Sequence, residues 1–324
     1  MVELMVAMTL GLLLMAAVLQ TFVGAKRTYE FQQEFSRIQE NGRFAMNFLT
    51  KAIRQADYWG CLKNAGVMDS NLEAVVGSDP TVGFEAVNKG SSFALSSGLG
   101  ESPDLFTVRG GREGGIPVTE NSAGVQIKLD KINHPTGMNI DQGDILIVTD
   151  CIHGEIFQVT TTNSATKTVT HNSGIPAVSP GNAAPAGLSN VYGPPDAVVY
   201  AADSMKFWIR TGAGGEPALV RGSEYDALTG GVELVEGIEN LQLLLGYDTN
   251  GDGVAESYAP PPPAAAGDPS EVVAVQVNLV ARSLRDNITD TSASFDFNGQ
   301  TYTPTDRRLR KVFTTNVAIR NRLN

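Results

Sequence analysis

The sequence has few of the residues from which most active sites are built. Its 324 residues include only two cysteines and three histidines (His134, His153 and His171), and the histidines show no metal-type spacing. It contains no G-x-S-x-G, phosphate-loop or H-E-x-x-H motif, and no cysteine paired with a histidine. The glycines of RGGREGG at 109–115 lack the order that would cradle a phosphate. We therefore expect a protein that is not an enzyme.

Charge is missing from the first part of the chain. No charged residue occurs in the 22 residues from Leu4 to Ala25, which as a helix would span roughly 30 Å of hydrocarbon. The segment has no basic region before it and no clear small-x-small cleavage motif, which argues against a cleaved secretory signal. Lys26 and Arg27 follow it directly. The sequence therefore predicts a membrane anchor with a single acid, Glu3, near its start.

Proline is also missing before residue 80, so nothing in the sequence interrupts a helix over 1–58. In the second half of this segment, small or apolar residues recur with a 4-3 spacing that marks one face of a helix: Phe31, Phe35, Ile38, Gly42, Ala45, Leu49, Ala52 and Ala56. We predict one continuous helix about 80 Å long. Because its second half is amphipathic, that half must pack on a head domain.

Residues 59–324 have the pattern of a β-rich globular head. Runs of alternating or β-branched apolar residues, separated by Gly, Asn, Asp and Ser, predict strands at 104–111, 124–130, 143–151, 155–162, 197–210, 217–223, 230–248 and 271–283. The Asn-Gly pair of FDFNGQTYTP at 295–304 predicts a hairpin. The segment APPPPAAAGDPS at 259–270 is expected to be an exposed proline-rich loop. The expected fold class is α+β: a long N-terminal helix packed on a large antiparallel, mainly β head.

Charge is distributed unevenly along the chain. The net charge is −11, with +1 on residues 1–58, +5 on residues 306–324 and −17 on the section between them. So acidic a head should be repelled by DNA and by anionic lipid headgroups. Residues 309–323 predict a strand with one apolar face and one basic face made of Arg308, Arg310, Arg320 and Arg322. These arginines either guard an exposed sheet edge or form a binding surface, and the acidic section offers them a partner in the same chain or in a neighbouring subunit.

The two cysteines, Cys61 and Cys151, bear on whether the head is exported from the cytoplasm. An even number of cysteines in a chain with a membrane anchor favours an exported head in which one disulfide closes a large loop. The alternative is a pair of buried free thiols.

The loop DTNGDGVAE at 248–256 has the spacing of a calcium-binding loop. Its oxygen-bearing positions are the candidate ligands: Asp248, Asn250, Asp252, Val254 through its carbonyl, and Glu256. Gly253 stands where such a loop makes its sharp turn, but position 12 is Ala259 instead of a bidentate glutamate. We therefore expect calcium binding that is weaker than in an intracellular sensor or is completed by ligands from elsewhere in the fold. The alternative is an Asx-rich hairpin turn without a cation.

Strings at both ends of the chain carry a family resemblance. VELMVAMTLGLLL at 2–14 resembles the mature N-terminus of type IV pilins and type II secretion pseudopilins. YEFQQEFSRIQENGRFAMNFLTKAIRQADYWGC at 29–61 and RRLRKVFTTNVAIRNRL at 307–323 resemble, more narrowly, the PilW family of minor pilins. The resemblance implies a structural subunit of the type IV pilus that helps to prime filament assembly and is incorporated near the tip. It also implies a part in cell adhesion, twitching motility or DNA uptake.

The resemblance implies a location and partners as well. Before assembly the chain would be a single-pass inner-membrane protein with its head in the periplasm, and after assembly it would be part of the pilus at the cell surface. Its partners would be the major pilin and other minor pilins, contacted through the N-terminal helix, with no direct nucleic-acid binding. Two alternatives stay open: a J-type minor pseudopilin of a type II secretion system, and a membrane-anchored periplasmic enzyme or binding protein.

Glu3 is the candidate assembly residue. In similar proteins the corresponding glutamate pairs with the N-terminal amine of a neighbouring subunit, and an uncompensated carboxylate in hydrocarbon is costly. The alternative is a glutamate at the membrane interface that is stabilised by the helix dipole. Family members are made with a short basic leader that ends in glycine before a phenylalanine. The printed residues contain none of these features, so we expect the natural start to lie upstream.

Overall fold

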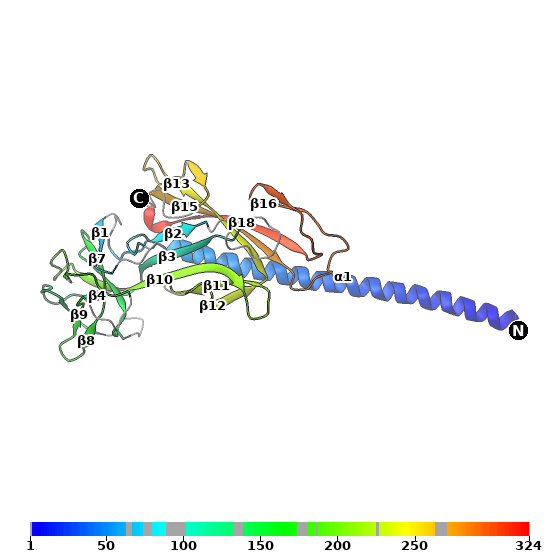
Figure 1. The fold of residues 1–324 in the computed structure, drawn as a ribbon, viewed down its shortest axis with the longest axis horizontal. Coiled ribbons are helices and arrows are strands. Elements are labelled where there is room, and N and C mark those ends of the chain that lie inside the picture. Colours follow the sequence, from blue (N-terminus) through cyan, green and yellow to red (C-terminus); the bar gives the residue numbers. More distant parts are fainter. Residues whose placement is uncertain are drawn as a thin grey trace.

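The structure is a computed structural model that describes residues 2–62, 67–73, 79–88, 102–132, 139–173, 180–185, 187–224, 227–262 and 271–323. One long helix, α1 (Val2–Gln55), leads into a β-rich head, and a short 3-10 helix, η4 (Arg320–Arg322), lies near the C-terminus. Figure 1 shows one half of α1 running along the head and the other half projecting far beyond it. The predicted α+β class, with a long N-terminal helix and a large antiparallel head, is confirmed.

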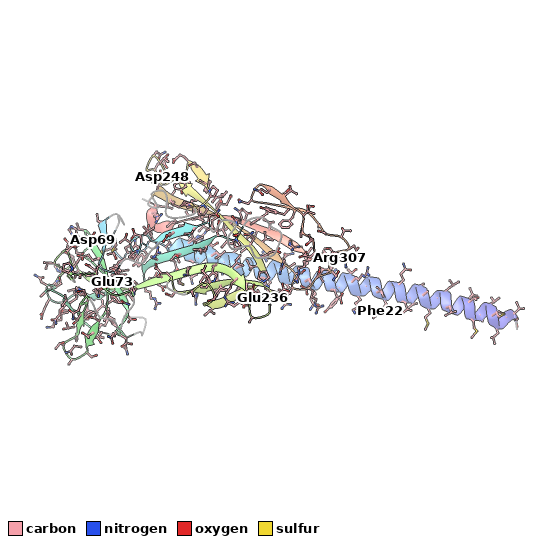
Figure 2. The ribbon with its side chains drawn as sticks, in the orientation of Figure 1. Phe22, Asp69, Glu73, Glu236, Asp248 and Arg307 are labelled. Carbon is pink, nitrogen blue, oxygen red and sulfur yellow. A yellow bond between two sulfur atoms is a disulfide. The ribbon has the colours of Figure 1, made fainter. Side chains whose placement is uncertain are left out.

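The projecting half of α1 is apolar and exposed. The side chains of residues 2–29 are exposed, and Phe22 is labelled on the part that leaves the head (Figure 2). This is the one helix in the described part of the chain that is long and apolar enough to cross a membrane. A helix that is apolar all round requires lipid or other helices around it.

The second half of α1 packs on the head along most of the predicted face. Ile38, Gly42, Ala45, Leu49 and Ala52 are buried. The prediction is wrong for the first two positions of the face, because Phe31 and Phe35 remain 39% and 38% exposed. Burial begins instead at Glu34, which is 3% exposed and has the guanidinium of Arg285 3.8 Å away.

Two larger sheets form the head. The nine-stranded sheet has the order β1-β7-β6-β10-β11-β12, with β2, β3 and β4 joined to it through β10 and β3. Its strands are β1 (Met68–Ser70), β2 (Phe84–Val87), β3 (Leu105–Gly111), β4 (Ile116–Pro117), β6 (Ile145–Thr149), β7 (Gly154–Gln158), β10 (Val198–Thr211), β11 (Pro217–Gly222) and β12 (Val232–Glu236). Its pairings are antiparallel except for β1 with β7.

The second sheet has the order β14-β13-β15-β18 and is antiparallel throughout. Its strands are β13 (Ile238–Tyr247), β14 (Ser257–Ala259), β15 (Val272–Arg282) and β18 (Arg310–Ala318). Two small sheets complete the described head, the hairpin β16 (Phe295–Phe297) with β17 (Gln300–Tyr302), and β5 (Gln126–Lys128) with β8 (Thr161–Asn163) and β9 (Thr168–Thr170).

Several strand predictions need correction at their ends. Residues 230–248 form two strands because Gly237 has a φ of 82°, a conformation that favours glycine and breaks the run. Residues 155–162 likewise divide into β7 and β8. Ala259 belongs to β14 instead of to a loop, and residues 263–270 of the proline-rich segment lie outside the described residues. The hairpin at Asn298-Gly299 is confirmed, with φ values of 50° and 76°.

The core between α1 and the sheets is a single apolar cluster. Ile38, Leu49 and Ile53 of the helix join strand residues such as Val277 and Leu279 in it. A second cluster at the far end of the head surrounds β6 and β7 and includes Phe157. The segments 29–61 and 307–323, which carry the family resemblance, therefore both contribute to the first cluster, at the junction of helix and head.

Most of the C-terminal arginines have acid partners within the chain. Arg310 Nε lies 2.6 Å from a buried carboxylate oxygen of Glu239, and Arg308 Nη2 lies 2.9 Å from Glu216. Arg322 pairs with Asp57 just after the end of α1. Of the predicted basic face only Arg320 is exposed without an ion pair in the described residues. Intramolecular pairing thus accounts for most of this basic face.

Candidate functional site

The end of α1 is fixed to the C-terminal segment. Asp57 accepts hydrogen bonds from Trp59 Nε1, at 2.6 Å, and from Arg322 Nε. The side-chain amide of Asn321 donates to the Ala56 carbonyl at 2.8 Å, satisfying a carbonyl at the helix end. The bonds of Asn321 and Arg322 join residues 265 positions apart in the sequence. The direction of the helix is therefore set by the head, and the two move together.

Glu3 lies in the first turn of α1, at the far end of the projecting half. Its neighbours Leu4, Met5 and Val6 are large, apolar and more than half exposed. Among the described residues no basic group forms an ion pair with it. The geometry thus presents one carboxylate in the first turn of a long, exposed apolar helix.

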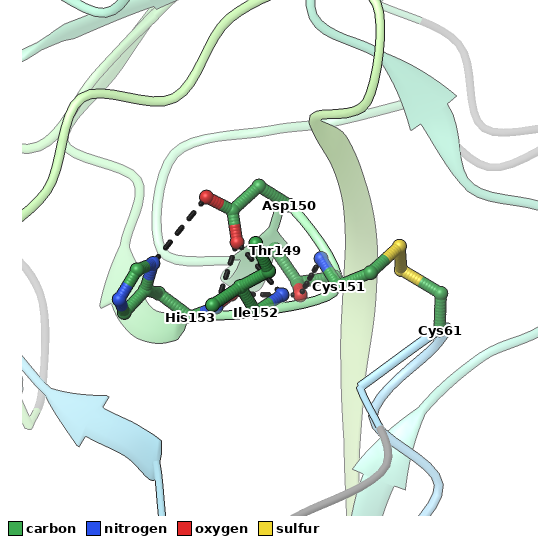
Figure 3. Close-up of a disulfide and its surroundings, with 6 residues drawn as sticks. All are labelled: Cys61, Thr149, Asp150, Cys151, Ile152 and His153. Carbon is green, nitrogen blue, oxygen red and sulfur yellow. Dashed lines mark hydrogen bonds and ion pairs between the residues drawn. A yellow bond between two sulfur atoms is a disulfide. The ribbon is translucent and has the colours of Figure 1, made fainter.

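The predicted disulfide is present. Cys61, six residues after the end of α1, bonds to Cys151, just after β6, across a separation of 90 residues (Figure 3). Asp150 organises the turn at Cys151 by accepting bonds from the backbone N–H groups of Ile152 and His153, at 2.9 and 2.6 Å. Desolvation acts to raise the pKa of Asp150, but these hydrogen bonds outweigh it and leave the pKa lowered. The bond ties the distal end of the head to the helix.

The acidic loop 248–256 connects β13 to β14, and Figure 2 places Asp248 on the head, far from Phe22. Asp248 Oδ1 accepts from the N–H of Gly251 at 2.6 Å, and its Oδ2 accepts from the N–H of Gly253 at 2.7 Å. Asp252 Oδ1 accepts from the N–H of Val254 at 2.8 Å. Gly251 and Gly253 have φ values of 81° and 82°, which other residues rarely adopt. The loop is thus built from consecutive Asx turns.

The loop also brings its carboxylates together. One oxygen from each of Asp248, Asp252 and Glu256 lies within 4.8 Å of the other two. The Asn250 amide donates to Glu256 at 2.7 Å and to Asp252 at 3.3 Å, so it bridges two of the acids. Desolvation acts to raise the pKa of Asp248, but backbone hydrogen bonds from Gly253 and its neighbours lower it below the usual range.

The donor set of this loop suits a hard cation, because its oxygens converge within the reach of one ion. Val254 is exposed, and Ala259 at position 12 offers no carboxylate and pairs with Leu245 in the sheet. Glu256 is the last acid of the loop, and it also accepts from the Thr249 N–H at 2.8 Å. Any cation here would keep part of its shell as water.

The histidines are separated from one another. His153 lies on the exposed turn with Nδ1 3.4 Å from Asp150. His171 is 1% exposed and packs on the ring of Phe157 with centroids 4.8 Å apart. His134 lies outside the described residues. The two cysteine sulfurs are bonded to each other, so neither is a free thiol that could form a catalytic pair with a histidine.

The sequence reasoning missed the acids that neutralise the C-terminal arginines, namely Asp57, Glu216, Glu239 and Asp306. One signal was available for Glu239, because it stands within the apolar run IENLQLLL of β13. An acid in such a run is buried at a cost unless it is paired.

Comparison with known proteins gives one match. Residues 206–321 match a family model described as PilW, Type IV Pilus-assembly protein W. The matched region begins within β10 and ends within η4, so it includes β15 and β18, the two strands with which α1 makes most of its contacts. Neither the curated proteins nor the solved structures contain a match to this chain.

Proposed function

We propose that this chain, whose residues 206–321 match the PilW family of type IV pilus assembly, is a minor pilin that helps to prime the filament and is incorporated into it near the tip. The role is structural and not enzymatic. The family match favours this role over the J-type pseudopilin and over a periplasmic enzyme or binding protein, the two alternatives that the sequence left open.

The observation that carries the proposal is the two-part character of α1. Residues 4–25 are uncharged, largely apolar and exposed on all sides, whereas the second half of the helix buries one face against the family-matched sheet. Such a helix can be held in lipid before assembly and among other helices afterwards without any change in the head. The exposed apolar half is then the contact surface for the major pilin and the other minor pilins.

This mechanism gives a location to each stage. The chain starts as a single-pass inner-membrane protein with the disulfide-bonded head in the periplasm, and it ends in a pilus at the cell surface. A disulfide in the head agrees with an oxidising compartment. Glu3 would be neutralised by a basic group of the neighbouring subunit when the helix leaves the bilayer. Through the filament the chain would take part in cell adhesion, twitching motility or DNA uptake.

The test uses two substitutions in the natural gene. We expect Glu3→Ala to reach the inner membrane in normal amounts but to be lost from sheared pili, because the carboxylate is needed only for transfer between subunits. Gln20→Ala, a polar-to-alanine change in the same apolar segment, is the matched control and should be incorporated normally. Deletion of the gene should reduce the number of pili. Wild-type piliation in the deletion strain would refute the proposed role, and normal incorporation of Glu3→Ala would refute the part given to Glu3.

For the loop 248–256 we propose calcium binding. The support is the convergence of Asp248, Asp252 and Glu256 on one point, with Asn250 and the Val254 carbonyl as further oxygen donors. Calcium would replace the amide bridge of Asn250 and hold the carboxylates together, which would stabilise the β13–β14 connection.

Titration calorimetry with calcium on the full chain in detergent tests this site. We expect saturable heat that is lost in Asp248→Ala plus Asp252→Ala. The double variant Asp130→Ala plus Asp290→Ala removes the same charge from exposed positions elsewhere and should bind as the wild type does. Equal calcium binding by both double variants would show that the ion is not held by this loop.

A further inference from the structure

The outer edge of β18 is a long row of backbone groups without partners in the described part of the protein. The strand lies at one end of the sheet order β14-β13-β15-β18, and it pairs with β15 over nine residues without a register shift. The bonds from Ile319 N to Val273 O and from Ser283 N to Leu309 O fix which residues point inward. In an antiparallel ladder the alternate residues then direct their N–H and C=O groups outward: Arg310, Val312, Thr314, Asn316 and Ala318.

Apart from the charged residues Arg310 and Lys311 at its start, β18 lacks the features that usually protect a sheet edge. β18 contains no proline, no glycine and no bulge, and it is about 30 Å long at the usual rise per residue. Its central outward residues, Thr314 and Asn316, are exposed. By comparison, the opposite edge strand β14 has three residues, and next to it the backbone of β13 is bonded by Asp104. The unprotected edge of β18 is therefore a place where another strand can add.

The helix beside this edge is also incompletely covered. Phe31 and Phe35 of α1 remain partly exposed, and Lys311 Nζ lies 5.4 Å from the centroid of the Phe35 ring. An added strand would place its own side chains over this aromatic strip, so backbone pairing and apolar burial would occur together.

Direction restricts the occupant. β18 runs parallel to α1, because Lys311 contacts Phe35, Phe313 contacts Gly42 and Asn321 contacts Ala56, so the residue numbers increase together along both elements (Figure 1). A two-fold pairing of β18 with β18 of a second copy would be antiparallel. It would then point the two α1 helices in opposite directions, and the two apolar halves could not enter one membrane from the same side.

We propose that the outer edge of β18 receives an edge strand from the head of a different pilin subunit, whose own N-terminal helix points the same way as α1. This proposal rests on the proposed function in the pilus. The added strand runs antiparallel to β18 and is recognised through its backbone. The outward N–H groups of residues 312, 314 and 316 are the donors, and the aromatic strip at Phe35 accepts its apolar side chains.

A proline substitution tests the backbone role directly. Asn316→Pro removes one outward N–H while leaving the inward bonds to β15 in place, since proline is tolerated where an edge N–H faces solvent. Asn316→Ala removes the same side chain but keeps the N–H. We expect both full-length variants in detergent to unfold within a few degrees of the wild type. In cells, Asn316→Pro should enter pili at least tenfold less than the wild type, whereas Asn316→Ala should enter normally.

A photo-crosslinking residue in place of Thr314, in the natural host, keeps the proposal testable if Asn316→Pro proves to be unfolded. We expect an adduct with another pilin, and none from the same residue in place of exposed Thr166 on the β8–β9 turn. Normal incorporation of folded Asn316→Pro, an adduct only between two copies of this chain, or no adduct would overturn the proposal. Those results would leave the minor-pilin role intact if deletion of the gene still reduces piliation, so the two failures are distinguishable.

Discussion

Gly42 of α1 lies against the aromatic ring of Phe313 of β18. A methyl group added at Gly42 would overlap the ring, so the close approach of helix and strand at this point requires glycine. A glycine inside a helix costs about 1 kcal/mol relative to alanine. The glycine allows the ring of Phe313 to pack directly across the helix. This packing lies in the contact between α1 and the family-matched sheet.

The first prediction is that Gly42→Ala destabilises the junction. Overpacking costs about 1–3 kcal/mol, and the helix gains about 1 kcal/mol from alanine, so we expect a net loss of about 1 kcal/mol. The measurement is thermal unfolding of the full chain in detergent. Gly24→Ala is the control, because nothing lies within 4 Å of a Cβ at that position. In the Phe313→Ala background the overlap is gone and only the helix-propensity gain is left, so Gly42→Ala should there stabilise the chain by about 1 kcal/mol. Strict additivity of the two changes would contradict the contact.

The second prediction concerns the Cys61–Cys151 disulfide. Its loop of 90 residues restricts the unfolded chain, and the chain-entropy relation gives about 4–5 kcal/mol for a loop of this length. Cys61→Ser plus Cys151→Ser should therefore unfold at a markedly lower denaturant concentration, by a similar amount to the wild type treated with reductant. If reductant also shifted the double variant, the loss would have to come from some other effect.

The third prediction is a loss of stability in mild acid through His171. Burial lowers its pKa from 6.5 to about 4, although Glu155 acts to raise it. Because the unfolded state takes up a proton below pH 6.5 and the folded state does not, stability falls as the pH falls from 6.5 towards 4, by up to about 3 kcal/mol. At pH 7 and above this contribution to stability is fully present.

Replacement of His171 separates this effect from general acid unfolding. Neither ring nitrogen has a hydrogen-bond partner among the described residues, so His171→Leu should be tolerated at pH 7.5. It should also be less sensitive to acid than the wild type between pH 7.5 and 4.5. His153→Leu, on the half-exposed turn, should keep the wild-type pH dependence. The same acid sensitivity in His171→Leu and in the wild type would contradict this assignment.

The fourth prediction concerns the buried acid Glu239. It holds the guanidinium groups of Arg310 and Arg282, with distances of 2.6 and 2.9 Å, and is itself fully buried. Glu239→Gln leaves two buried cations with one carboxylate fewer, and breaking such a pair costs about 3–5 kcal/mol. Glu233→Gln, on the neighbouring strand β12 and partly exposed, should cost much less. Urea unfolding of both variants at pH 7 measures the difference, and equal midpoints would refute a structural role for the pair.

Much of the fold follows from periodicity. The uncharged run, the absence of proline and the 4-3 spacing predicted a single helix, and α1 ends three residues before the predicted boundary at 58. The Asn-Gly hairpin and the β-branched run at 271–283 were likewise correctly assigned. These features depend on local backbone preferences and on the spacing of apolar side chains, and both properties can be read directly from the sequence.

Other features depend on which segments meet. The sequence could not show that Phe31 and Phe35 stay exposed, because their burial depends on where the sheet ends along the helix. From the sequence, the C-terminal arginines could either guard an exposed sheet edge or form a binding surface. Only the structure shows that three of them form ion pairs within the chain: Arg308 with Glu216, Arg310 with Glu239 and Arg322 with Asp57. The calcium loop is intermediate, since its spacing is local but the convergence of its oxygens is a property of the folded turn.

The sequence by itself therefore determined the long apolar helix, Glu3 at its tip, the β-rich head, the two cysteines that pair and the residues that resemble PilW. Only the tertiary structure decided that β18 runs beside α1 in the same direction and that its outer edge pairs with no other strand among the described residues. The physical reason is that strand order and direction are set by contacts between residues hundreds of positions apart, such as Gly42 with Phe313, for which the linear pattern carries no signal.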